Sequence, residues 1–171
     1  MMTTLHSLTR RALRASGCAL AVLCLLATPV QAQPRTPPTT LNAVAPLDAP
    51  TWQRLLDKGP RPAAYLFATT GCTPCQSAFR QLRDYVLTQR RMAELVVVWM
   101  DVERFKALEH ASEFQSATRV YAFHGDAAAI RRSIEPHWPD AEPFIVLVDR
   151  SGFVMRHSGA PSAQLLQQWL Q

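Results

Sequence analysis

Residues 63–75 have the sequence AAYLFATTGCTPC, in which an uninterrupted apolar run leads through Thr-Thr-Gly to the pair Cys72 and Cys75. The apolar run predicts a buried β-strand over 63–69. From Cys72 to about residue 90, apolar side chains recur at helical spacing, which predicts a helix with one buried face. Cys72 would then lie at the helix N-terminus, where the positive end of the helix dipole stabilises a thiolate. This placement indicates a redox site.

Further apolar runs and periodic segments on both sides of this stretch predict an α/β chain. Residues 95–100 are apolar at every position, which is typical of a central parallel strand with both faces buried. The expected strands are 63–69, 95–100, 121–123, 144–148 and, after a turn at 151–152, 153–155; the expected helices are 51–57, 72–90, 103–116, 127–134 and a last one with Pro161 at its first position.

Residues 1–32 have the pattern of a cleavable export signal. A segment with three arginines precedes a mostly apolar stretch over 15–27, and small residues at 30 and 32 end it where a signal peptidase would cut. The apolar stretch is shorter than the roughly 20 residues that span a bilayer, although retention as an N-terminal anchor is the alternative. We therefore expect a periplasmic protein with no stable membrane span after cleavage.

The rest of the chain divides into a tether and one domain. Residues 33–50 carry five of the thirteen prolines, separated by small and polar residues, and this composition predicts an extended tether. Residues 51–171 are long enough for a single domain whose core needs no crosslinks.

Charge and cysteine counts narrow the possible functions. The expected signal holds three of the eighteen basic residues and none of the thirteen acidic ones, so the working protein is close to neutral. Without a clustered basic stripe, nucleic-acid binding is not expected. The signal also holds two of the four cysteines, which leaves Cys72 and Cys75. These two close almost no loop, so they cannot form a structural disulfide framework.

A metal site is the competing interpretation of the cysteine pair. A zinc site needs two further ligands, and the histidines at 110, 124, 137 and 157 have no metal-type spacing among themselves. We expect no metal and no cofactor other than a redox-active Cys72–Cys75 disulfide.

The chain resembles the thioredoxin-fold thiol-disulfide oxidoreductases, and it is most similar to their exported TlpA-like and ResA-like group. The resemblance lies in Phe67-Ala68-Thr69 before the Cys-x-x-Cys helix and in residues 143–154, PFIVLVDRSGFV. The latter match the family's proline, apolar strand, Asp and Gly turn, and second apolar strand. The resemblance implies a central mixed β-sheet flanked by helices over about 51–171. The long interval between Cys75 and Pro143 implies a mid-domain insertion.

The two cysteines differ in depth on the predicted helix. Cys72, at the exposed end, is expected to be the attacking thiolate, and Cys75, one turn further in, the resolving thiol that breaks the mixed disulfide. Pro74 suits the first turn of a helix, where its missing N–H costs nothing. Gly71, Thr73 and Pro74 are expected to border the substrate.

Pro143 and Glu142 are the other expected substrate-binding residues. In the family this proline follows a cis peptide bond and packs beside the cysteines, which leaves the backbone of the preceding residue free to pair with an extended substrate. An ordinary trans proline entering a strand is the alternative. The charge of Glu142 would favour cationic substrates and oppose thiolate formation, unless its side chain is simply solvated.

The chain also departs from the family pattern. Gly71 replaces the usual aromatic residue before the first cysteine, and Arg80 replaces a frequent helix proline. Leu66 stands where thioredoxins keep a buried acid that helps to deprotonate the second cysteine. His124 is either a proton donor from the insertion or a surface histidine.

These observations together predict an exported thiol-disulfide oxidoreductase that reduces, or exchanges disulfides with, protein substrates. The Thr-Pro dipeptide between the cysteines lacks a histidine that would stabilise the thiolate, which favours a reductant over an oxidant. A periplasmic reductant implies a membrane thiol-reductase of the DsbD kind as electron donor. The alternative from a different class is a binding or assembly module of an envelope or secretion complex, built on a thioredoxin scaffold.

Overall fold

The computed structural model describes residues 44–171 except 108 and 140. The expected signal at 1–32 and residues 33–43 of the expected tether lie outside the described residues. Within the described part of the chain, no helix is long and apolar enough to cross a membrane.

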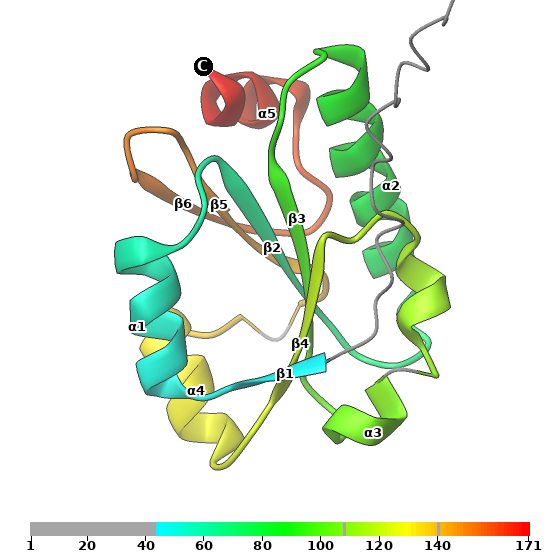
Figure 1. Cartoon of the computed structure of the whole chain (residues 1–171), viewed down its shortest axis with the longest axis vertical. Helices are drawn as coiled ribbons and strands as arrows, with labels where there is room; N and C mark the ends of the chain where they lie inside the picture. The colour runs from blue at the N-terminus through cyan, green and yellow to red at the C-terminus, as the bar shows by residue number, and fades with distance from the viewer. Residues whose placement is uncertain (1–43, 108, 140) are drawn as a thin grey trace, which may run out of the picture. The chain divides into compact units, whose positions relative to one another are not determined.

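Six strands form one mixed sheet in the order β1-β4-β3-β2-β5-β6 (Figure 1). The first four in this order are parallel, and β5 and β6 are antiparallel to their neighbours. Every residue of β2 and β5 is buried, as expected for strands covered on both faces. The strands are β1 (Val44–Leu47), β2 (Ala63–Ala68), β3 (Glu94–Trp99), β4 (Arg119–Phe123), β5 (Phe144–Val148) and β6 (Val154–Ser158).

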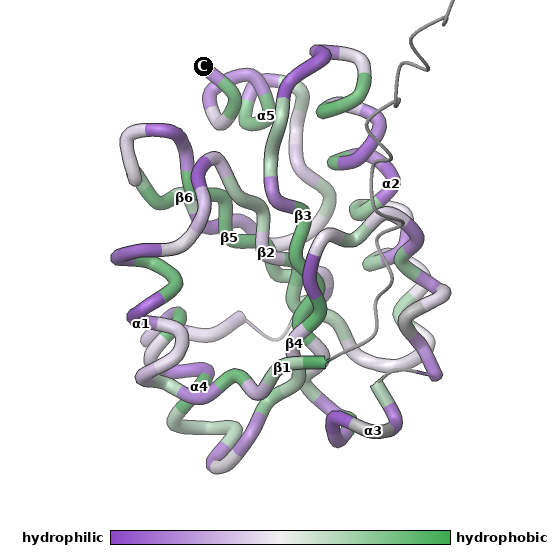
Figure 2. Tube along the Cα trace, in the orientation of Figure 1, coloured by the Kyte–Doolittle hydropathy of each residue, from purple (hydrophilic) through white to green (hydrophobic). Residues whose placement is uncertain are grey.

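Helices cover both faces of the sheet, so the predicted α/β class is confirmed. One apolar core contains residues of α2 (Thr73–Thr88), α3 (Arg104–Ala107), the 3₁₀ helix η1 (Ala111–Phe114) and α5 (Ala163–Leu170). The other contains residues of α1 (Ala49–Lys58) and α4 (Ala127–Ile134). Figure 2 shows hydrophobic and hydrophilic residues alternating along α2, whose buried positions pack in the first core.

Side-chain caps fix where several helices begin. Asp48 accepts a hydrogen bond from the Thr51 N–H, and Asp126 accepts two from the first turn of α4. Ser162 accepts one from Leu165 N, so the last helix begins at Ala163. The prediction that Pro161 occupies the first helical position is therefore wrong, because the cap follows the proline.

The expected tether and the domain boundary at residue 51 need correction. Val44–Leu47 form β1, which pairs with β4, and α1 already begins at Ala49. β1 is an edge strand, where a proline such as Pro46 is tolerated because one row of its backbone groups needs no partner. Val44 and Leu47 are both buried, so this segment is part of the domain core.

The continuous helix expected over 103–116 is also wrong, because the described residues of this segment form α3 and the short η1 as separate elements. Phe114 does point inward, as expected: its ring packs edge-on against Phe79 and Trp99, with ring centroids 5.3 Å away in each case. Tertiary packing of this ring outweighs the local helical periodicity.

Candidate active site

The two cysteines lie where the central parallel strands end, which is the usual position for sites in open α/β sheets. β2 ends at Ala68, and the loop 69–71 leads directly into α2. Gly71 turns the chain in the left-handed region (φ 73°), which favours glycine. It is exposed beside Cys72, and its expected contact with substrate stays a prediction.

Cys72 and Cys75 form a disulfide at the start of α2. Cys72 is the N-cap residue, and its Sγ accepts a hydrogen bond from the Cys75 N–H at 3.1 Å. Negative charge on this sulfur would be stabilised by that N–H and by the helix dipole. Cys72 is half-buried, whereas Cys75 is 0 % exposed. The arrangement therefore offers one accessible sulfur and one that only its neighbour can reach.

Thr73 and Pro74 are exposed in the first turn of α2, between the two cysteines. Pro74 stands in the first turn, as expected, where its ring fits without the loss of a helical hydrogen bond. These two residues form the outer surface of the disulfide-bearing turn, and their role in substrate binding stays a prediction.

The register of β5 brings Pro143 and Glu142 to the same place. β5 runs antiparallel to β2 with Phe144 opposite Phe67, so the residues before β5 face the loop after β2. The Glu142–Pro143 peptide bond is cis, as the resemblance implies. Pro143 is buried, and its carbonyl accepts a hydrogen bond from Gly159 N at 2.7 Å.

The Glu142 side chain lies beside the disulfide rather than in a purely solvated position. Its Oε2 accepts a hydrogen bond from Thr69 Oγ1 at 2.7 Å. One carboxylate oxygen and the sulfurs of Cys72 and Cys75 all lie within 4.8 Å of one another. The two sulfurs are bonded to each other, and a structural zinc site needs four ligands, so these three residues do not form one in the oxidised protein.

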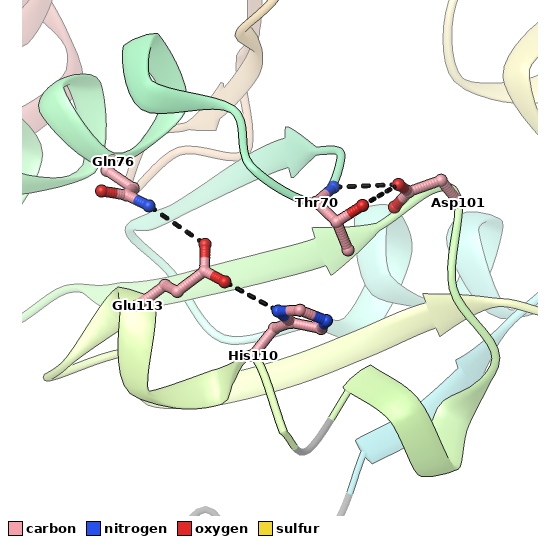
Figure 3. A network of polar contacts seen from close by, with 5 residues as sticks. All are labelled: Thr70, Gln76, Asp101, His110 and Glu113. Atoms are coloured by element: carbon pink, nitrogen blue, oxygen red, sulfur yellow. Dashed lines mark hydrogen bonds and ion pairs between the residues drawn. The ribbon is translucent and has the colours of Figure 1, made fainter.

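An acidic residue at the end of β3 holds the loop that leads to Cys72 (Figure 3). Asp101 Oδ2 accepts hydrogen bonds from both the backbone N–H and the hydroxyl of Thr70, at 2.9 and 2.6 Å. Asp101 therefore acts as an anchor for the active-site loop. In the sequence, Asp101 is visible only as the acidic residue directly after the apolar run 95–100.

A second polar network links η1 to the residue after Cys75 (Figure 3). Gln76 Nε2 donates to Glu113 Oε2 at 3.0 Å, and His110 Nδ1 lies 2.7 Å from Glu113 Oε1. The His110 ring also lies against Trp99, with ring centroids 5.7 Å apart. Sequence reasoning missed this network, although a His-x-x-Glu pair beside the apolar Phe114 was a signal that both side chains share one turn.

His124 does not join the cysteines among the described residues. It is exposed after β4, its backbone N–H donates to Leu47 O at 2.9 Å, and it lines a hollow with Glu103 and Arg104. β3 separates β4 from β2 in the sheet. The surface interpretation of His124 fits this position, and a proton-donor role gains no support.

No protein-family model matches the sequence, and no curated protein matches it. The chain is similar to several solved structures of thiol-disulfide oxidoreductases. One is a candidate thiol:disulfide interchange protein DsbE from Chlorobium tepidum, with 23% identity over 67% of this chain and 81% of that chain and a TM-score of 0.48. A thio-disulfide isomerase from Thermus thermophilus has 18% identity over 66% of this chain and 79% of that chain, with a TM-score of 0.48. A secreted disulfide oxidoreductase from Mycobacterium tuberculosis has 15% identity over 63% of this chain and 76% of that chain, with a TM-score of 0.43.

The chain's own geometry identifies the fold. A mixed sheet has helices on both faces, a Cys-x-x-Cys disulfide begins the helix that follows a central strand, and a cis proline precedes the antiparallel strand beside it. This chain has the thioredoxin fold and carries a Cys-x-x-Cys disulfide at the position that the resemblance implies.

Proposed function

We propose that this protein is an exported thiol-disulfide oxidoreductase that reduces, or exchanges disulfides with, protein substrates through Cys72 and Cys75. The observation that carries the proposal is the unequal burial of two bonded cysteines at one helix N-terminus. A disulfide of this kind can be opened from one side only, as a directed exchange reaction requires.

The two cysteines and a substrate disulfide supply every sulfur and every electron that the exchange moves. In the reduced protein, the Cys72 thiolate attacks one substrate sulfur, which forms a mixed disulfide and releases the other substrate sulfur as a thiolate that takes a proton from water. Cys75 then attacks Cys72 Sγ, and the second substrate thiol leaves. The protein loses two electrons and ends as the Cys72–Cys75 disulfide, while the substrate disulfide gains them.

The backbone of the loop before β5 is an argument that an extended substrate binds beside the disulfide. Within the described chain, the backbone of Glu142 makes no hydrogen bond, whereas the Pro143 carbonyl is already bound by Gly159. An unpaired backbone segment at this point suits pairing with a substrate strand. Thr73 and Pro74 would contact the substrate from the helix side.

The direction of electron flow and the location are part of the proposal. The dipeptide between the cysteines adds no positive charge, and Glu142 places a negative one nearby, so the thiolate lacks the strong stabilisation of an oxidant. A reductant in the periplasm needs a supply of electrons, for which we propose a membrane thiol-reductase of the DsbD kind. Residues 1–32, with their basic and apolar segments, support export.

Insulin reduction tests the activity. With dithiothreitol as reductant, the protein should accelerate precipitation of the insulin B chain, and Cys72→Ser should remove the acceleration. Ser77→Ala, at an exposed position one turn further along α2, is the matched control and should keep it. If the wild-type protein carries free thiols and still fails to accelerate the reaction, thiol-disulfide exchange is excluded as its function. A binding or assembly module on a thioredoxin scaffold is then favoured.

A further inference from the structure

The Glu142 carboxylate is held in a defined position at the disulfide. Thr69 Oγ1 donates a 2.7 Å hydrogen bond to Oε2, and a carboxylate oxygen lies within 4.8 Å of both sulfurs. The register of β5 against β2 fixes the two loops that carry these groups. The Glu142 carboxylate is therefore held where it can interact with both sulfurs.

Cys75 has to lose a proton before it can attack, and its own surroundings cannot accept one. The residue is 0 % exposed, within a cluster of apolar side chains that includes Leu66 of β2. Among the described residues, no Asp, Glu, His, Lys or Arg side chain is buried, and the buried phenols of Tyr65 and Tyr121 belong to the other core. The proton acceptor must therefore approach from the exposed side of the disulfide.

The other acidic groups at this end of the sheet are engaged elsewhere. Asp101 accepts two hydrogen bonds from Thr70, and Glu113 is bound by Gln76 and His110. From β6, His157 lies opposite Ile145, and its Nε2 is 3.0 Å from Ala160 O. Within the described part of the chain, Glu142 has no ionic partner. It is the carboxylate best placed to exchange a proton with the sulfurs.

We propose that Glu142 is a catalytic residue that carries a proton from Cys75 to the leaving substrate thiolate, a step that rests on the proposed function. In the mixed disulfide, the carboxylate takes the Cys75 proton directly or through one water. The Cys75 thiolate forms a bond to Cys72 Sγ, and the bond between Cys72 and the substrate sulfur breaks. Glu142 then gives the proton to that sulfur and is again ionised.

A purely electrostatic role of Glu142 has the opposite consequence. If the carboxylate only repels thiolates, removing its charge makes the Cys75 thiolate easier to form and speeds the resolving step. If the carboxylate accepts the proton, the same change slows that step. The two explanations can therefore be separated by the sign of one effect.

The test follows the reaction of the reduced protein with one equivalent of 5,5′-dithiobis(2-nitrobenzoate). Attack by Cys72 releases a first thionitrobenzoate, and attack by Cys75 on the mixed disulfide releases a second, so stopped-flow absorbance separates the two steps. Rates are compared from about pH 5 to about pH 9, a range around the usual thiol pKa of about 8.5. Glu142→Gln keeps the shape of the side chain and can still accept the Thr69 hydrogen bond.

Three variants are compared with the wild type. Glu142→Gln should slow the second release roughly tenfold or more near pH 7 without slowing the first, and the difference should shrink above the thiol pKa. Asp84→Asn removes the same charge from an exposed position nine residues after Cys75, about 13 Å along the helix, and should match the wild type. Glu113→Gln tests the rival acid and should not slow the second release tenfold.

Two results would overturn the proposal while leaving the proposed function intact. One is a second release that is as fast or faster in Glu142→Gln, and the other is an equal loss in Glu113→Gln. A wild-type protein that gives no second release would overturn the proposed function together with this proposal.

Discussion

Two cysteines three residues apart have different environments because a helix places them at different depths. Cys72 caps the helix and is half-buried, whereas Cys75 belongs to the apolar core. The helix N-terminus stabilises a thiolate on Cys72, and burial protects Cys75 from everything except its neighbour. The roles that we propose for the two residues, attacking and resolving, follow from this difference.

Cys75→Ser should therefore accumulate mixed disulfides with substrate, because no thiol remains to resolve them. Cys72→Ser should trap none, since its remaining thiol is buried. Non-reducing electrophoresis after incubation with oxidised substrate distinguishes the two variants. In the reduced wild-type protein, Cys72 should be alkylated first, and faster alkylation of Cys75 would contradict these roles.

The local pattern of the sequence predicted Cys72 and Cys75 as site residues, and the family resemblance implied Pro143 and Glu142. Neither predicted the polar contacts around them. The bonds Thr69–Glu142, Gln76–Glu113 and Thr70–Asp101 join residues 73, 37 and 31 positions apart. Such pairs depend on strand register and on the path of the chain between β3 and β5, which periodicity does not encode.

At the scale of elements, the predictions hold where the hydrophobic pattern of a segment is itself enough to indicate how the segment is buried. Residues 144–148 and 127–134 were predicted with the observed bounds, since a fully apolar run and an amphipathic segment each have a clear signal. β1 was missed because four residues containing a proline are a strand only through pairing with β4. η1 was missed because packing of Phe114, rather than periodicity, determines its path.

Phe114→Ala should be strongly destabilising, because the ring is 1 % exposed and packs against Phe79 and Trp99. We expect the free energy of unfolding to fall by about 3–5 kcal/mol, the usual cost of removing a buried aromatic ring. Urea unfolding followed by tryptophan fluorescence measures the change. Gln115→Ala, at the exposed neighbouring position, is the control. A loss below about 1 kcal/mol would show that η1 does not pack on the core.

At the scale of the whole molecule, the sheet separates two cores built mainly from aliphatic and aromatic side chains. On the side covered by α1 and α4, Tyr65 packs edge-on against Trp52, with ring centroids 5.2 Å apart. Burial raises the pKa of Tyr65 to about 12. The folded protein therefore keeps this phenol neutral at pH values where the unfolded chain ionises it.

Stability should consequently depend on Tyr65 at alkaline pH. Its contribution is complete below pH 10, where the phenol is neutral in both states, and is lost as the pH rises from 10 through about 12. Tyr65→Phe should remove this dependence, worth on the order of 2–3 kcal/mol, in denaturant unfolding at increasing pH. Tyr85→Phe on α2 is the comparison, and equal alkaline losses in both variants would contradict the assignment.

The central claim is that Cys72–Cys75 is a redox-active disulfide of a reductant. The helix dipole stabilises the Cys72 thiolate, but the carboxylate of Glu142 within 4.8 Å of the sulfurs opposes it. Equilibration with glutathione, followed by thiol trapping and mass analysis, measures the result. We predict a reversible midpoint below roughly −200 mV, nearer thioredoxin at about −270 mV than DsbA at about −120 mV. A midpoint close to that of DsbA would contradict the claim that the protein acts as a reductant. A disulfide that stays oxidised below about −300 mV would contradict the claim that it is redox-active at all.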